Sequence, residues 1–190
     1  MKYLLSAIVL FVLAEIAYSQ GESASLGLTF DATACYSFEL SKFYSNYTDE
    51  IKKHGFAFSQ KIYLRSQEAL GIGIETGFYN IASLRADTVR ADLNTIPICL
   101  ILSHNLKYFY LNSGIGYYYT MSKISTNGAI SKSSGFEFGF MLSASRYFKL
   151  NDWLGAVVEA EYLSITESQK SIISVGIGLS LALPLYKSGE

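Results

Sequence analysis

An unbroken alternation of apolar and polar side chains runs through residues 26–40, LGLTFDATACYSFEL. Even positions hold Leu, Phe, Ala or Tyr, and odd positions hold Gly, Thr, Asp, Cys, Ser or Glu. A period of two sustained over this length predicts a β-strand with one apolar and one polar face. An apolar face that points inward belongs to a soluble barrel or sandwich, whereas one that points outward belongs to a membrane protein.

The same alternation predicts eight strands in all, and no helical period is visible. The strands cover residues 26–40, 55–65, 69–79, 92–103, 108–121, 135–149, 153–165 and 171–183. Connectors after the second, fourth and sixth strands are short, and those after the first, third and fifth are long and polar. Tight periplasmic turns at one end and extended outer loops at the other are typical of a transmembrane barrel. The outer loops are expected at residues 41–54, 80–91 and 122–134.

Side-chain size indicates which face is inside. The polar faces are rich in Gly, Ser and Ala, which suit a narrow eight-stranded interior that is filled by its own side chains. Charged residues make up only 16% of the chain, against about 25% in ordinary soluble domains. We therefore expect the apolar rows to face lipid between belts of aromatic residues. The predicted fold is all-β: an eight-stranded, antiparallel, up-and-down transmembrane β-barrel formed by residues 20–190.

The first twenty residues, MKYLLSAIVLFVLAEIAYSQ, have the pattern of a secretory signal. Lys2 precedes an apolar run that is too short to span a bilayer, and small residues at Ala17 and Ser19 precede Gln20. We expect residues 1–19 to be a signal peptide cleaved after Ser19. Export, an even strand number and the apolar faces predict a bacterial outer-membrane location with both termini in the periplasm.

Residues 93–119, LNTIPICLILSHNLKYFYLNSGIGYYY, resemble a signature of the outer-membrane β-barrel proteins common in Bacteroidetes, which include the PorT-like proteins. The matching parts are Ile96-Pro97 with the apolar run after it, and residues 109–112 leading into Gly114 and Gly116. The resemblance implies a barrel of the OmpA/OmpX type after a signal peptide, and its members have varied roles. The C-terminal aromatic residue of many such proteins is absent here, and Tyr186 is the nearest substitute.

Pro97 and two cysteines stand out within the predicted strands. Proline removes a hydrogen bond from a barrel that has no edge, so a local β-bulge is expected at Pro97. Cys35 and Cys99 fall on the interior faces of the first and fourth strands, which are not neighbours. We expect two free, buried thiols, with a cross-barrel disulfide as the alternative.

The polar faces also carry ionisable residues, which we expect to form a buried charge network around two bases. Buried charges need partners, so the first interpretation is a plug of ion pairs that makes the barrel rigid. The alternative is a gated cation path, which the small bore of eight strands opposes. The predicted network comprises Asp31, Glu39, Lys61, Arg65, Glu75, Glu137, Lys149, Glu159 and Glu161.

Few residues could support catalysis. His104 is expected in a short periplasmic turn, and His54 lies near Ser41, Ser45 and Ser59 at the outer mouth. An outer-membrane lipid acyl hydrolase that uses His54 is one alternative, but a non-enzymatic protein is the prediction. No metal-ligand spacing or cofactor motif is present, and the near-zero net charge suggests no nucleic-acid partner.

The sequence therefore predicts a structural or adhesive barrel, or a component of a surface or secretion complex, that acts through its outer loops. Expected partners are outer-membrane lipids and, through the loops, other surface proteins or glycans. The first alternative is a soluble, secreted, lipocalin-like carrier that would use the apolar face as a ligand pocket.

Overall fold

The computed structural model describes residues 25–40, 51–52, 54–66, 70–85, 89–126 and 129–187, and regular structure in them consists of β-strands. Among these residues there is no helix long and apolar enough to cross a membrane. The strands are β1 (Ser25–Glu39), β2 (Ile51–Lys52), β3 (His54–Ser66), β4 (Leu70–Arg85), β5 (Val89–Asn105), β6 (Tyr110–Thr126), β7 (Ala129–Lys149), β8 (Leu154–Ile165) and β9 (Lys170–Lys187).

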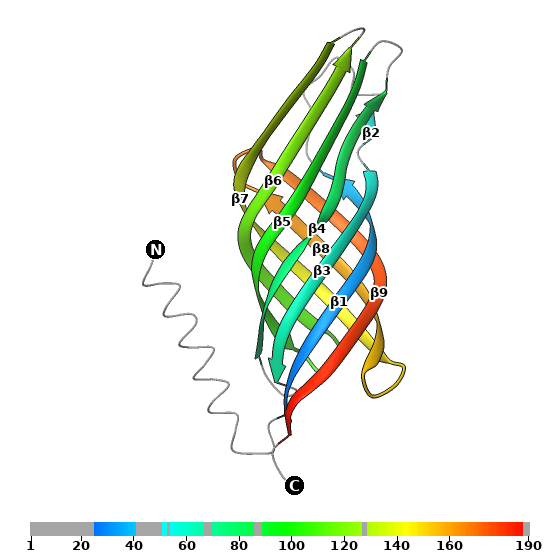
Figure 1. Ribbon diagram of the computed structural model, residues 1–190, viewed down its shortest axis with the longest axis vertical. Coiled ribbons are helices and arrows are strands. Elements are labelled where there is room, and N and C mark those ends of the chain that lie inside the picture. Colours follow the sequence, from blue (N-terminus) through cyan, green and yellow to red (C-terminus); the bar gives the residue numbers. More distant parts are fainter. Residues whose placement is uncertain are drawn as a thin grey trace, which may run out of the picture.

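Eight long strands form a closed antiparallel ring (Figure 1). Each pairs with its neighbour along the chain, β1 pairs with β9, and the pairing of β4 with β5 closes the ring on the other side. The two residues of β2 only add to the upper end of β4. The predicted eight-stranded barrel is therefore confirmed. Closure matters because an unpaired backbone N–H or C=O group in hydrocarbon costs roughly several kcal/mol, and in a closed ring each strand has a hydrogen-bonding neighbour on both sides.

The apolar rows of the strands point outward, as predicted. Phe56, Ile74, Ile98 and Ile177 are 62%, 58%, 53% and 69% exposed, and the other large apolar residues of these rows are exposed or half-buried. A lipocalin-like carrier needs these rows around a central pocket, so that alternative is wrong. Two apolar grooves of about 430 and 420 Å³ lie on this outer surface, where acyl chains fit.

Aromatic side chains gather on the outer surface at two levels. Towards the upper end, Tyr119 and Phe136 of neighbouring strands have ring centroids 4.9 Å apart, and Tyr117 and Phe138 lie 5.9 Å apart. At the lower end, exposed aromatic residues lie in or beside the turns: Tyr108, Phe109, Phe148 and Trp153. These levels match the two membrane interfaces that Tyr and Trp prefer.

Three tyrosine side chains fill much of the interior, and glycines on neighbouring strands leave the space for their rings. Tyr63, Tyr79 and Tyr118 are each 0% exposed. A Cβ atom on Gly73 would lie 2.6 Å from Tyr63 Cδ1, and one on Gly139 would lie 2.7 Å from Tyr118 Cε2. The small residues of the polar faces therefore provide the volume that these rings occupy.

Two predicted outer loops prove to be strand. β4 and β5 remain paired up to Arg85 and Arg90, and β6 and β7 up to Thr126 and Ala129. Residues 80–91 and 122–134 thus mostly extend the sheet above the barrel, as β4 to β7 do at the top of Figure 1. Alternation of apolar and polar residues fades there because both faces meet water. Of the loop expected at 41–54, residues 41–50 and 53 lie outside the described residues.

The expected bulge at Pro97 is also absent from the described strands. Pairing of β4 with β5 is interrupted between Thr76–Ile98 and Tyr79–Thr95, but the register is the same on both sides. The ladder thus opens locally where the proline N–H is missing, without an extra residue. The register shift lies higher, at Ile81 of β4, whose side chain is 1% exposed.

A matched pair of substitutions tests the lipid-facing surface. Ile177→Lys lies midway along β9, and we expect it to lower the free energy of unfolding by about 2–4 kcal/mol in lipid vesicles. Ile130→Lys changes an isoleucine of similar exposure, 64%, in the part of β7 above the aromatic belt, and we expect a change within about 0.5 kcal/mol. Urea titrations monitored by tryptophan fluorescence measure both. Equal costs would contradict the membrane assignment.

Candidate functional site

The strongest cluster of charges lies inside the barrel around Lys61 of β3. Its ammonium nitrogen lies 2.6 Å from Glu161 Oε2 and 2.7 Å from Glu159 Oε2, and 3.8 Å from Glu75 Oε2 on β4. All four side chains are 0–3% exposed. Because β3 and β8 are separated by β1 and β9 in the ring, these ion pairs cross the interior.

Neutral side chains extend this cluster to other strands. The Tyr79 hydroxyl lies 2.5 Å from Glu161 Oε1 and 3.0 Å from Glu75 Oε1. On β7, Ser145 donates to Glu159 at 2.8 Å, and Asn112 of β6 donates to Ser145 at 3.1 Å. These neutral partners were not predicted as part of the network, although the alternation places them on the polar faces of their strands.

The Lys61 cluster joins strands on opposite walls and fills the middle of the bore. One ammonium group faces three carboxyl groups, so Lys61 is the group on which their burial depends. No group of three or more His, Cys, Asp or Glu residues that could hold a metal ion occurs in the described part of the chain. This arrangement suits a rigid plug.

A second cluster surrounds Arg65, nearer the lower end. The guanidinium carbon lies 3.8 Å from the ring centroid of Tyr63, 4.5 Å from that of Tyr110 and 4.9 Å from that of Tyr147. Arg65 Nη2 donates to the Tyr147 hydroxyl at 2.9 Å, and this hydroxyl donates to Asp31. Ring faces and a hydrogen-bonded relay thus hold Arg65, which is 8% exposed, and among the described residues no carboxylate forms an ion pair with it.

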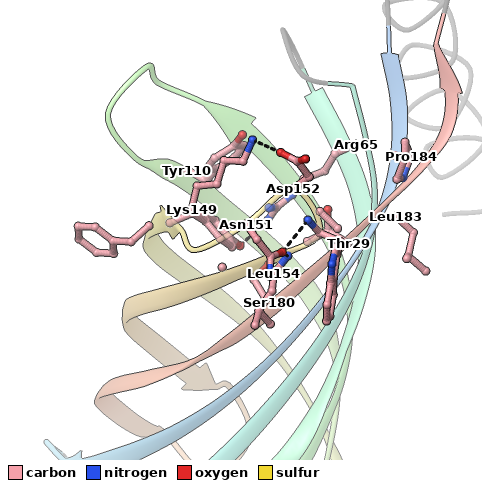
Figure 2. A pocket seen from close by; sticks show the side chains of 16 residues that line it. Thr29, Arg65, Tyr110, Lys149, Asn151, Asp152, Leu154, Ser180, Leu183 and Pro184 are labelled. Atoms are coloured by element: carbon pink, nitrogen blue, oxygen red, sulfur yellow. Dashed lines mark hydrogen bonds and ion pairs between the residues drawn. The ribbon is translucent and has the colours of Figure 1, made fainter.

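A pocket of about 390 Å³ opens beside Arg65 at the lower end of the barrel, the end that points upwards in Figure 2. The turn at residues 150–153 forms one wall, where Asn151 accepts a hydrogen bond from the Leu154 N–H. Lys149 lies 2.7 Å from Asp152, and its hydrogen bond and charge hold the pKa of this carboxyl below its usual value. These two charges neutralise each other at the rim, and Arg65 is the remaining charged residue of the lining.

The remaining residues of the predicted network lie apart from both clusters. Glu39 is 6% exposed at the upper end of β1, and Glu137 is half-buried on β7. Lys149 was expected inside the barrel, but its side chain is 71% exposed and pairs with the turn instead. It is the last residue of β7, where the interior already meets water.

The two thiols are free and buried, as expected, since Cys35 and Cys99 are 4% and 1% exposed. The acyl hydrolase alternative would need His54 beside a serine, and no such pair occurs within the described residues. His54 is exposed and its ring bonds to the Tyr36 hydroxyl, whereas Ser59 is buried inside the barrel. Ser41 and Ser45 lie outside the described residues. His104, expected in a turn, is part of β5.

The projecting part of β7 has an open edge. β7 pairs with β8 only from Gly139 downwards, and both the N–H and the hydroxyl of Thr166 donate to the Phe138 carbonyl, at 2.9 and 2.7 Å. Within the described ranges, residues 129–137 have no strand partner on this side. Because Phe138 points its backbone groups to this edge, Ser134 and the other even-numbered residues do so too.

Comparisons with known proteins agree with this architecture. No protein-family model matches the chain, and no curated protein matches it either. Among solved structures, Ail of Yersinia pestis in complex with the heparin analogue sucrose octasulfate has 10% identity and a TM-score of 0.54. The alignment covers 84% of this chain and 99% of Ail.

Two further structures are similar. Neisserial surface protein A (NspA) has 13% identity and a TM-score of 0.57, over 81% of this chain and 96% of NspA. The outer membrane protein OprG from Pseudomonas aeruginosa has 11% identity and a TM-score of 0.50, over 86% of this chain and 98% of OprG. At these identities the likeness concerns the fold.

The closed ring, the lipid-facing rows and the two aromatic levels define an integral β-barrel protein of the bacterial outer-membrane class. Within this class, the chain is an eight-stranded barrel with a polar interior and a sheet that projects above the membrane.

Removal of the central cation tests the Lys61 cluster. Lys61→Met leaves three buried carboxyl groups without their ammonium partner, so we expect the free energy of unfolding to fall by about 3–5 kcal/mol. Lys107→Met, at an exposed turn, is the control, and we expect a change within about 0.5 kcal/mol. Adding Glu161→Gln to Lys61→Met should recover part of the loss. Equal costs for both lysine variants would show that the ion pairs do not hold the interior.

Conductance distinguishes the plug from a cation path. We expect the protein to insert into planar bilayers without resolved conductance steps, because Lys61 and the three buried tyrosines fill the bore. Discrete, cation-selective steps at neutral pH, lost in Glu159→Gln, would contradict a plug.

Proposed function

We propose that this chain is a non-enzymatic surface protein whose projecting sheet binds a partner protein by strand addition along β7. The barrel anchors the sheet in the outer membrane, and the open edge at residues 129–137 presents backbone donors and acceptors to the partner. Addition of an extended segment to an exposed sheet edge is a common mode of peptide recognition.

The observation that carries this proposal is the length of unpaired edge. Nine residues of a strand correspond to roughly 30 Å, which is enough for a partner strand of ordinary length. Exposed edges of this kind pair with other chains unless charged residues or prolines prevent it. Between residues 129 and 136 of this edge, Lys132 is the only residue of these types. The serines at 131, 133 and 134 are compatible with a partner backbone lying alongside.

A different protein is a better partner than a second copy of this chain. Two copies in one membrane have β7 running in the same direction, so they could add to each other only as parallel strands. Parallel pairing is slightly less stable per residue, and a free segment of another protein can adopt the antiparallel direction.

The resemblance of residues 93–119 to the PorT-like proteins of Bacteroidetes is in keeping with a role in a surface or secretion complex, where the partner is a protein. The cleaved signal at residues 1–19 belongs to the same proposal, because export must precede insertion in the outer membrane.

A glycan is the second candidate partner. The observation in its favour is that Ail was solved with sucrose octasulfate, an anionic saccharide analogue, together with the basic side chains that the projecting sheet carries here.

Strand addition can be tested with proline substitutions, made separately, at two neighbouring positions of β7. A photoreactive residue in place of Ser131 should give a discrete cross-linked product in whole cells, and one in place of Leu150, in a lower turn, should not. Ser134→Pro removes a donor that points to the open edge, so we expect it to abolish the product while the barrel keeps its heat-modifiable shift on gels.

Ser133→Pro is the matched variant, with the same substitution at the neighbouring position. It removes a donor that points to β6, so it loosens the projecting sheet but leaves the donors of the open edge in place. A product that persists in Ser134→Pro, or no product from position 131, would refute strand addition.

A further inference from the structure

The outward face of the projecting sheet is basic just above the aromatic belt. On β4 to β7, the described residues of this face include four with cationic side chains and one with a carboxylate, since directly paired residues share a face. The five are Arg85, Arg90, Asp92, Lys123 and Lys132.

Like charges stand directly opposite one another on this face. Lys123 of β6 pairs with Lys132 of β7, and Arg85 of β4 pairs with Arg90 of β5. Like charges at directly opposite positions destabilise a sheet. The only carboxylate of the five, Asp92, lies 3.4 Å from Arg90 and stands directly opposite Lys123 on the β5 side, but no ion pair joins either lysine to a carboxylate within the described ranges. An external anion would relieve this repulsion.

The same strands carry an apolar path below the lysines. On the outward face, Tyr119 and Phe136 lie next below Met121 and Ser134, and Tyr117 and Phe138 follow. Below them is the groove of about 420 Å³ between β5, β6 and β7, which Leu100, Ile115 and Phe140 help to line. A basic site, an aromatic step and an apolar groove thus follow one another down a single face.

The length of this path matches one leaflet. From Lys123 to Ile115 is roughly 27 Å along the strand, or about 20 Å along the membrane normal at a tilt of about 40°. Half of the hydrocarbon core and one headgroup layer together measure about 20–22 Å. When Ile115 lies at the bilayer centre, the lysines are therefore at the level of the outer-leaflet headgroups.

We propose that Lys123 and Lys132 bind a phosphate group of an outer-leaflet lipid whose acyl chain lies in the groove between β5, β6 and β7. The Arg85–Arg90 pair lies two residues higher, where it adds positive potential for a second phosphate of the same headgroup. This site does not depend on strand addition at β7, because the binding surface is the outward face and not the edge.

The test uses nanodiscs of phosphatidylcholine that hold the full-length mature barrel and a titrated amount of bisphosphorylated lipid A. Native mass spectrometry of the extracted protein measures bound lipid. A lysine near an anionic surface contributes roughly fivefold in affinity, so Lys123→Gln with Lys132→Gln should weaken binding by about 30-fold. The control double variant, Lys107→Gln with Lys149→Gln, makes the same charge change at the lower turns and should bind as the parent does. All variants must show the heat-modifiable shift of a folded barrel.

Further probes identify the source of the phosphate chemistry. Dephosphorylated lipid A should bind the parent at least as weakly as phosphorylated lipid A binds the double variant, and inorganic phosphate should not compete. Equal binding of the parent and the double variant, or of the two lipids to the parent, would overturn the proposal. Tight binding of sucrose octasulfate that displaces the lipid would also overturn it, and would assign this face to a soluble glycan.

Discussion

Closure of the sheet is the constraint on which the rest of this structure depends. Within hydrocarbon no water is available to the peptide groups, so each strand needs neighbours on both sides, and the pairing of β4 with β5 supplies the last of them. Once the ring is closed, the period of two leaves no freedom: alternate side chains meet lipid and the others meet each other. Above the membrane the same requirement lapses, and there β7 leaves the ring with an open edge below the hairpin that joins it to β6.

The interior solves a packing and a charge problem together. Glycines on the polar faces admit the Tyr63 and Tyr118 rings, and these rings with Lys61 leave little of the bore open. A single ammonium group holds carboxyl groups from two strands, while Arg65 is held by ring faces lower down. Polar residues inside a barrel of this size therefore act as its core, in the place that apolar residues take in a soluble domain.

Most of the fold was predictable from the sequence, because alternation reports directly on a surface with lipid on one side. Strand number, order and facing followed from it. The upper parts of β4 to β7 were missed since water on both faces removes the pattern, and the shift at Ile81 changes its phase. Pro97 correctly predicted an interruption of the hydrogen-bond ladder, but the predicted bulge is absent because the register is the same on both sides. For the site, the alternation of side chains along each strand correctly placed Lys61 and its carboxyl groups on interior faces. It did not predict that Lys149, at a strand end, pairs with Asp152.

The central claim is that apolar side chains cover the outside of the barrel, and lipid-phase photolabelling of β9 tests it most directly. A small apolar carbene precursor dissolved in the vesicle membrane should label Ile173, Val175, Ile177 and Leu179, and leave Ile172, Ser174 and Ser180 unlabelled when peptides are mapped by mass spectrometry. Labelling of the even-numbered residues, or none along β9, would contradict the account.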